Sequence, residues 1–170
     1  QRPQLDTEYL DDTVRKIIER VKTEGDRALK ALTFELDNVQ IKSLQVSENE
    51  ISAARNELSD DLVDAIQLAS ANIEKFHVAQ RRDAMVIDTM PGVQCWRKSI
   101  AIEKVGLYIP SGSAPLFSTV LMLGIPARIA GCKEIVLCTP PDKDGKINPA
   151  ILFAASSVNI KKIFKVGGAQ

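Results

Sequence analysis

Three short apolar runs in the C-terminal part of the chain constrain its fold more than any other feature. They cover residues 105–109, 134–138 and 162–166. Their starts lie about 30 residues apart, the length of one strand, one crossover helix and the return to the next strand. Strands that alternate with helices in this way form parallel sheets. The sequence therefore predicts a βαβαβ unit with a parallel sheet from residue 105 onward.

The two segments between these runs are predicted to be the crossover helices. Residues 149–158 form a helix with one apolar face. The segment 116–130 is apolar nearly all round, so we expect it to be deeply buried. It contains Pro126, and a proline inside a helix removes a hydrogen bond and costs about 3 kcal/mol. We therefore expect two shorter helices that meet near Pro126, the second ending at Gly131.

The first 80 residues repeat apolar side chains at helical spacing. The first stripe consists of Leu10, Val14, Ile17, Ile18 and Val21. Gly25 is expected to end this helix and Asp26 to cap the next one. In that second helix, one face carries Leu29, Leu32 and Leu36.

Two further helices in this region have strong start signals. Residues 47–50 read Ser-Glu-Asn-Glu, a capping box in which Ser47 and Glu50 each bind the other's backbone N–H. Ser59 is expected to cap the longest helix of the chain. The apolar stripe of that helix consists of Leu62, Ile66, Ala69, Ile73 and Phe76.

Period-two alternation replaces the helical pattern after Arg82. Residues 90–93, Met-Pro-Gly-Val, place proline and then glycine at the centre of a turn, as in type II geometry. We predict a β-hairpin whose second strand continues to Ile102. The fold class is therefore α/β, with a helical region and a β-hairpin followed by a parallel sheet.

Composition argues against several functional classes. Lysine plus arginine number 22, as do aspartate plus glutamate, so the chain lacks the basic excess of proteins that bind nucleic acid or anionic membranes. No apolar run approaches the roughly 20 residues of a membrane span, and no secretory leader is recognisable. Of the three cysteines, Cys132 and Cys138 flank a predicted strand and are expected to be reduced core residues. A cytoplasmic location is expected.

Common catalytic and metal-binding motifs are missing from the sequence. It contains no G-x-G-x-x-G, no P-loop, no C-x-x-C and no G-x-S-x-G. The single histidine, His77, is explained as a residue at a helix C-terminus, where the dipole favours it. The chain is therefore not expected to hold a zinc ion by itself.

The turn after the first predicted strand is the best candidate for a ligand site. It spans residues 108–116, where Gly112 permits a tight backbone and Ser113 can cap the next helix, with Pro115 in its first turn. Residues 167–170, Gly-Gly-Ala-Gln, end the third strand at the same edge of the sheet, where ligands of open α/β sheets lie. The pattern fits a ligand site and also fits a well-capped strand–helix junction.

Four segments taken together resemble histidinol dehydrogenases. They are V-G-L-Y-I-P-x-G-S-A-P-L-F-S-T-V-L-M-L at 105–123, P-A-R-I-A-G-C-K at 126–133, V-L-C-x-P-P at 136–141 and V-G-G-A-Q at 166–170. The N-terminal helices resemble the family more loosely, in V-K-x-x-G-D-x-A-L (21–29) and N-I-x-x-F-H-x-A-Q (72–80). The resemblance covers nearly the whole chain but only the N-terminal part of a family member.

The resemblance implies an enzyme that oxidises L-histidinol to L-histidine in two NAD-dependent steps. It also implies a zinc-containing homodimer with two incomplete Rossmann-like domains. The helices and the hairpin (1–104) would belong to the first, and residues 105–170 would begin the second, which binds NAD. In the family, the tyrosine of Y-I-P and the glutamine of G-G-A-Q contact NAD, and these are Tyr108 and Gln170 here. The zinc ligands, the proton-transferring residues and the histidinol contacts lie downstream of Gln170, so no catalytic or metal-binding residue is expected in this chain. Ser111 departs from the glycine that many members have.

The last predicted strand is followed by a glycine turn, where a doubly wound sheet would continue with a helix. We therefore expect this chain to be part of a longer protein and to be inactive towards histidinol by itself. One alternative is a small-ligand or protein-binding module built on a half Rossmann-like sheet. A third hypothesis is that uncovered apolar faces make the chain pair with itself.

Overall fold

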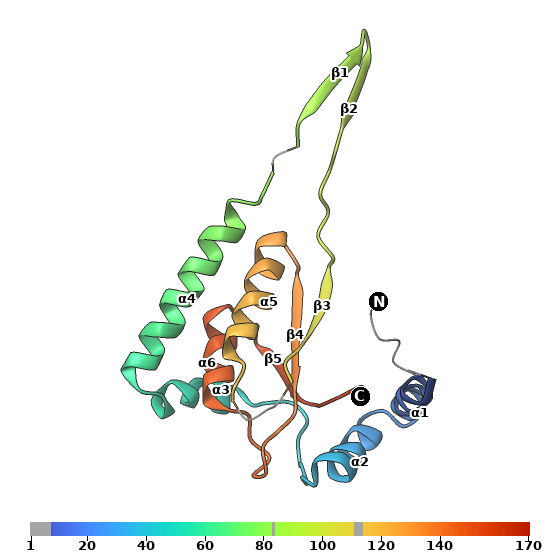
Figure 1. Ribbon diagram of the computed structural model, residues 1–170, viewed down its shortest axis with the longest axis vertical. Helices are drawn as coiled ribbons and strands as arrows, with labels where there is room; N and C mark the ends of the chain where they lie inside the picture. Colours follow the sequence, from blue (N-terminus) through green and yellow to red (C-terminus); the bar gives the residue numbers. More distant parts are fainter. Residues whose placement is uncertain (1–7, 83, 111–113) are drawn as a thin grey trace, which may run out of the picture.

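The computed structural model describes residues 8–82, 84–110 and 114–170. Figure 1 shows a body of helices around a small sheet, with a hairpin that projects from one end. In chain order, the elements are α1 (Glu8–Glu24), α2 (Asp26–Asp37), α3 (Glu48–Ala53), the 3-10 helix η1 (Ala54–Glu57), α4 (Asp60–Val78), β1 (Val86–Met90), β2 (Val93–Trp96), β3 (Lys104–Tyr108), α5 (Phe117–Ala130), β4 (Glu134–Thr139), α6 (Pro149–Ser157) and β5 (Lys162–Lys165).

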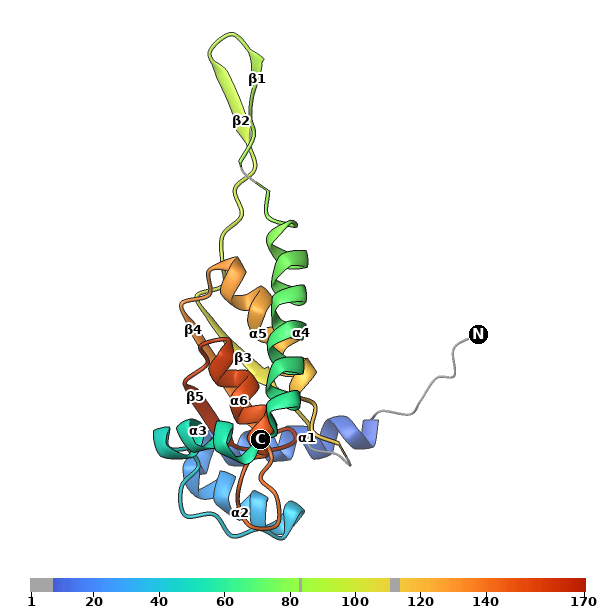
Figure 2. The ribbon, with the colours of Figure 1, turned by 90° about the vertical axis from the view of Figure 1, so that its left-hand side faces the viewer.

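The predicted parallel sheet is confirmed, and with it the α/β class. Its strand order is β3-β4-β5, and both pairs are parallel. Leu107, Leu137 and Ile163 lie side by side in register and belong to the main core or pack against it. Helices α5 and α6 contact each other and lie on one face of the sheet with α4 (Figures 1 and 2).

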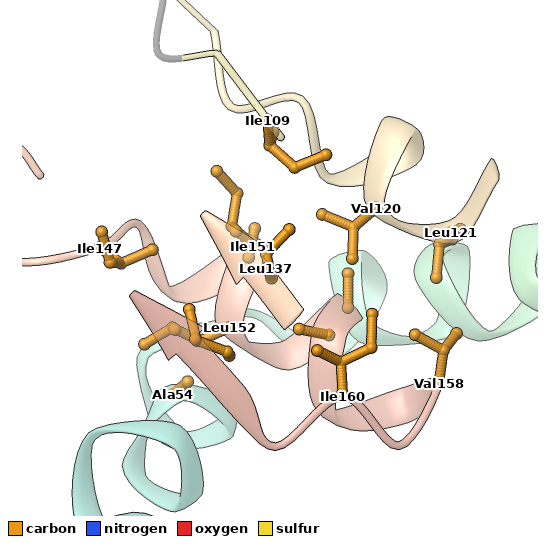
Figure 3. Close-up of a cluster of buried hydrophobic side chains, with 14 of the residues drawn as sticks. Ala54, Ile109, Val120, Leu121, Leu137, Ile147, Ile151, Leu152, Val158 and Ile160 are labelled. Carbon is orange, nitrogen blue, oxygen red and sulfur yellow. The ribbon is translucent and has the colours of Figure 1, made fainter. Parts of the chain in front are cut away.

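The main core fills the space between the sheet and these helices. Figure 3 shows side chains of α5, α6 and β4 converging there, with Ala54 of η1 at the edge of the cluster. The two crossover helices approach closely because α5 has a glycine at the contact. A Cβ added at Gly124 would lie 2.9 Å from Val158 Cγ2 and 3.0 Å from Ile160 Cδ1.

Helix α5 differs from the prediction at Pro126. A single helix runs from Phe117 to Ala130 with Pro126 inside it, so the expected break is wrong. Burial of Val120, Leu121 and Ile125 on the core side outweighs the local cost of the proline. The helix does end at Gly131, which has a φ of 91°. The expectation of burial all round is also wrong, because the opposite face of α5, which carries Met122 and Leu123, is exposed.

The predicted helix starts are mostly confirmed in the N-terminal region. Ser47 and Glu50 form the full capping box, and the Ser59 side chain accepts a hydrogen bond from Leu62 N. Asp26 is not a cap, since Gly25 takes that position with a φ of 59° and Asp26 is the first residue of α2.

The apolar stripes of α2 and α4 are not buried along their whole length. Leu36 near the end of α2 and Phe76 near the end of α4 are both exposed. Each lies in the last turn of its helix. Nearer the start of each helix, a residue of the same apolar stripe is buried, Leu32 in α2 and Ile66 in α4. Helical periodicity gives the direction in which a side chain points, but not how far along the helix the covering surface extends.

The hairpin forms as predicted around its turn. Gly92 has a φ of 80°, the left-handed conformation that the third position of a type II turn requires. The second strand, however, ends at Trp96 rather than Ile102. Trp96 pairs with Val86, the first residue of β1, so the partner strand stops there. The boundary proposed between residues 104 and 105 stays a prediction.

Candidate functional site

The two residues singled out on the strand edge lie close together. Tyr108 is the last residue of β3, and its hydroxyl accepts a hydrogen bond from Gly168 N at 3.0 Å. Gln170 folds back over the same turn, and its Oε1 accepts a hydrogen bond from Gly167 N at 3.1 Å. The end of β3 and the segment after β5, which are far apart in sequence, therefore form one edge.

A pocket of about 770 Å³ lies beside this edge and is lined by both Tyr108 and Gln170. Its floor is the sheet face opposite α5 and α6. Tyr108, Cys138 and Phe164 lie in register across that face. The apolar side chains of the pocket make its floor suitable for a flat organic ring.

Gly106 keeps part of this floor open. It lies two residues before Tyr108 and lines the same pocket. A Cβ added there would meet no atom within 4 Å, so the space above it is empty. The backbone of β3 at Gly106 is therefore accessible from the pocket.

The opposite wall comes from the N-terminal segment, which sequence reasoning did not connect with the site. Lining residues from α2 and from the loop that follows it are Asp26, Leu29, Lys30, Lys42, Ser43, Leu44 and Gln45. This loop runs antiparallel to β5, because Lys165 N donates to Leu44 O at 2.7 Å and Val46 N donates to Ile163 O at 2.9 Å. The only sequence signal for this wall is the loosely matching segment 21–29, which includes Asp26 and Leu29.

The pocket combines an apolar floor with a polar rim. Burial raises the pKa of the Cys138 thiol, so this side chain stays neutral at physiological pH. Lys30 and Lys42 are exposed at the rim, and Asp26 is the single acidic side chain among the lining residues. The described part of the chain forms no ion pair with either lysine. The rim can therefore offer two free cations to a ligand.

The loop between β3 and α5 differs from its prediction where it is described. Helix α5 begins at Phe117, and Leu116 at the N-cap makes no side-chain hydrogen bond. Pro115 is therefore not in the first turn, and the helix start expected at Ser113 is wrong. Ser111, Gly112 and Ser113 lie outside the described residues.

The single histidine and the three cysteines lie outside the edge formed by Tyr108 and Gln170, except for Cys138, which lines the pocket. His77 lies in the last turn of α4, where its Nδ1 is 2.8 Å from Gln80 Oε1. The three cysteines are free, Cys95 at the surface and the other two half-buried. Residues 8–82, 84–110 and 114–170 contain no group of three or more His, Cys, Asp or Glu side chains that could hold a metal ion. No helix in these ranges is long and apolar enough to cross a membrane.

Comparison with known proteins gives one consistent family. A family model described as histidinol dehydrogenase matches residues 1–170. The chain is 60% identical over 170 residues to histidinol dehydrogenase of Bacteroides fragilis (strain YCH46), with all of this chain and 40% of that protein aligned. It is 48% identical over 164 residues to the enzyme of Escherichia coli O6:H1, covering 96% of this chain and 37% of that protein.

A solved structure agrees with the sequence comparisons. The crystal structure of histidinol dehydrogenase from Elizabethkingia anophelis superposes with a TM-score of 0.95 at 52% identity. It covers all of this chain, which in turn covers 39% of that one. The chain thus spans about 40% of the length of the relatives it matches.

Proposed function

Because this chain belongs to the histidinol dehydrogenase family, we propose that it takes part in the oxidation of L-histidinol to L-histidine through the aldehyde, with two NAD as hydride acceptors. The observation that carries the proposal is 60% identity along the full 170 residues to a named histidinol dehydrogenase. Residues 105–170 are proposed as the start of the NAD-binding domain and residues 1–104 as part of the other domain.

The edge of the sheet at Tyr108 and Gln170 is the proposed NAD site, since ligands of open α/β sheets lie beyond the carboxyl ends of the strands. Gly168 in this edge lets a ligand approach the backbone, since a Cβ there would meet nothing within 4 Å. Tyr108 and Gln170 are proposed to contact the cofactor. NAD, when bound, supplies the hydride acceptor, while these residues bind and orient it.

Zinc does not fit the described residues, which gather no set of three ligands. The family resemblance places the zinc ligands and the proton-transferring residues C-terminal to Gln170. We therefore assign no chemical step in this chain to zinc, and we propose that residues 1–170 alone do not oxidise histidinol.

A homodimer in the cytoplasm is proposed from the same family resemblance. Exposed apolar side chains on the hairpin support an association surface, with Val86, Ile87, Met90, Val93 and Trp96 each 41–63% exposed. Apolar patches of this kind on a soluble protein are typical of interaction sites. The hairpin also projects from the body, where a second subunit can reach it (Figure 2).

The test is NADH formation from histidinol, measured by absorbance with zinc added. Two proteins are compared, the product of the complete coding sequence and residues 1–170 alone. We expect activity only in the former. Activity of residues 1–170 alone would show that the reacting groups lie within this chain, and inactivity of both would favour a binding module built on this half-sheet.

A further inference from the structure

Gly167, in the turn after β5, packs directly against the turn after β4. A Cβ added at Gly167 would lie 2.9 Å from Pro140 Cβ and 3.3 Å from Pro140 Cγ. Asp37 Oδ2, at the end of α2, would lie 3.6 Å from the same added atom. Gly167 is itself buried. The position therefore has no room for a side chain unless a neighbour moves.

The lack of space, and not the backbone conformation, explains the glycine at position 167. Gly168 has a positive φ, whereas Gly167 is not among the glycines of the described residues that do. The φ of Gly167 is thus one that other residues adopt. Because packed interiors tolerate little overlap, a methyl group at Gly167 would have to push the turns after β4 and β5 apart.

Pro140 is suited to act as a fixed support at this contact. It follows Thr139, the last residue of β4, whose carbonyl accepts a hydrogen bond from Val166 N at 3.1 Å. Thr139 and Pro141 are both buried, so the backbone on each side of Pro140 is held in the interior. The proline ring is closed onto the backbone and restricts φ to about −65°, so it cannot rotate away as an open side chain could.

The supported turn holds both residues of the proposed cofactor edge. Gly167 N donates a hydrogen bond to Gln170 Oε1 at 3.1 Å, and Gly168 N donates one to the Tyr108 hydroxyl at 3.0 Å. Both N–H groups therefore lie at or next to the contact with Pro140. A displacement of this turn would move Gln170 and change the hydrogen bond of Tyr108 together.

We propose that Pro140 is a positioning residue of the NAD site and that it acts through Gly167. Its ring sets the distance between the turns after β4 and β5, and thereby the positions of Gln170 and Tyr108. This inference rests on the proposed NAD function and adds a residue that family resemblance did not select. Groups that are held in place before binding give higher affinity, because less ordering is needed when the ligand binds.

The experiment is a double-mutant cycle in the protein expressed from its complete coding sequence. Gly167→Ala adds the methyl group that meets Pro140, and Pro140→Gly removes both of the carbon atoms nearest to that methyl group. Pro140→Ala is the matched control, because it opens the ring but keeps the Cβ that lies 2.9 Å away. Each Pro140 variant is made alone and together with Gly167→Ala.

Two measurements are made on each variant. Calorimetric titration gives the affinity for NAD. Fluorine NMR of protein labelled with fluorotyrosine reports the surroundings of Tyr108, whose resonance is assigned by its loss in Tyr108→Phe. The NMR measurement follows the contact between Tyr108 and Gly168 without NAD, so a failure of this inference can be separated from a failure of the proposed function.

We expect Gly167→Ala to weaken NAD binding about tenfold and to shift the Tyr108 resonance. Pro140→Gly alone should weaken NAD binding about threefold, since the turn after β4 gains backbone freedom. Combining Gly167→Ala with Pro140→Gly should return the affinity to that of Pro140→Gly alone and the resonance towards its original position. Combining Gly167→Ala with Pro140→Ala should leave NAD binding as weak as in Gly167→Ala.

The inference is wrong if Gly167→Ala leaves both the NAD affinity and the Tyr108 resonance unchanged. It is equally wrong if Pro140→Ala restores binding to Gly167→Ala as well as Pro140→Gly does, because the decisive contact would then not be the Cβ. Should Gly167→Ala not fold, Pro140→Gly alone decides, and unchanged affinity there overturns the inference. If the resonance behaves as expected but the unsubstituted protein does not bind NAD, the proposed function fails and the role of Pro140 in a cofactor site fails with it.

Discussion

The Tyr108 hydroxyl accepts a hydrogen bond from Gly168 N at 3.0 Å, although 60 residues separate the two in sequence. The bond joins the end of β3 to the turn after β5, across the intervening strand β4. Gly168 has a φ of 59°, a conformation that glycine adopts readily. The bond orients the tyrosine at the pocket edge and holds the glycine turn beside it.

Removing the Tyr108 hydroxyl should weaken NAD binding. Tyr108→Phe loses one hydrogen bond, worth about 1 kcal/mol, which corresponds to about fivefold in affinity if the turn at Gly168 helps to hold the cofactor. Tyr108→Ala also removes the ring and should weaken binding at least tenfold. Calorimetric titration with NAD gives both values. Unchanged affinity in Tyr108→Ala would exclude this residue from the cofactor site.

Two glycine-to-alanine substitutions should separate stability from binding. Gly124→Ala places a Cβ 2.9 Å from Val158 Cγ2, and overpacking should outweigh the gain in helix propensity and lower the free energy of unfolding by about 1–2 kcal/mol. Gly106→Ala meets no atom within 4 Å and should leave stability nearly unchanged. Its methyl group enters the space beside Tyr108 and should weaken NAD binding instead. Urea unfolding and NAD titration distinguish the two, and the reverse pattern would contradict both assignments.

The ion pair between Glu50 and Lys165 should make stability fall in acid. Lys165 Nζ donates to Glu50 Oε1 at 2.6 Å, and the lysine side chain is 10% exposed. Burial acts to raise the pKa of Glu50, but hydrogen bonds from Lys165 and Ser47 outweigh it and lower the pKa below its ordinary value of 4.5. A lowered pKa in the folded state stabilises the fold above pH 4.5, and that contribution is lost as the pH falls through the folded-state pKa.

The check is urea unfolding as a function of pH for the unsubstituted chain and for Glu50→Gln. The variant should be less stable at pH 7 by about 1–2 kcal/mol and should lose less stability below pH 4.5. Part of the acid sensitivity should remain, because hydrogen bonds also lower the pKa values of Glu35 and Glu134. Adding Lys165→Met to Glu50→Gln should recover stability by removing the unpaired ammonium group. Identical pH profiles would show that the pair contributes nothing to folding.

Trp96 should contribute to association if the proposed homodimer uses the hairpin. Its side chain is 63% exposed and lies opposite Val86 across the two strands. Large aromatic side chains dominate many protein interfaces, so Trp96→Ser should weaken dimerisation about thirtyfold or more. Leu68→Ser on α4, which is 64% exposed, is the matched control. Light scattering over a dilution series measures the effect, and equal dimerisation in both variants would place the interface elsewhere.

Helix starts and the hairpin turn were predicted correctly, because each depends on residues close together in the sequence. Ser47 with Glu50, Ser59 and the glycine at position 92 each act within about four residues, and the structure confirms all three. The spacing of the apolar runs was enough to predict the parallel sheet, because only a crossover helix of that length returns the chain to a parallel neighbour. Tyr108 and Gln170 were also selected from sequence, through family resemblance.

The wrong expectations concern places where local sequence preference and tertiary packing disagree. Pro126 disfavours a helix locally, yet α5 continues through it because its core face is buried by α6 and α4. Leu36 and Phe76 continue apolar stripes, yet nothing among the described residues covers them. Neither the size of the gain from burial nor the extent of a covering surface can be deduced from one segment alone.

The sequence by itself determined the identity and order of most elements and the family to which the chain belongs. Only the tertiary structure decided that Tyr108 meets Gly168 and that Lys30 and Lys42 face them across one pocket. Helix caps, turns and apolar periods depend on residues close together in the chain, whose interactions are similar in many folds. The pocket depends on strand order and on the hydrogen bonds that place Leu44 beside Lys165, and such contacts between distant residues form only when the whole chain packs.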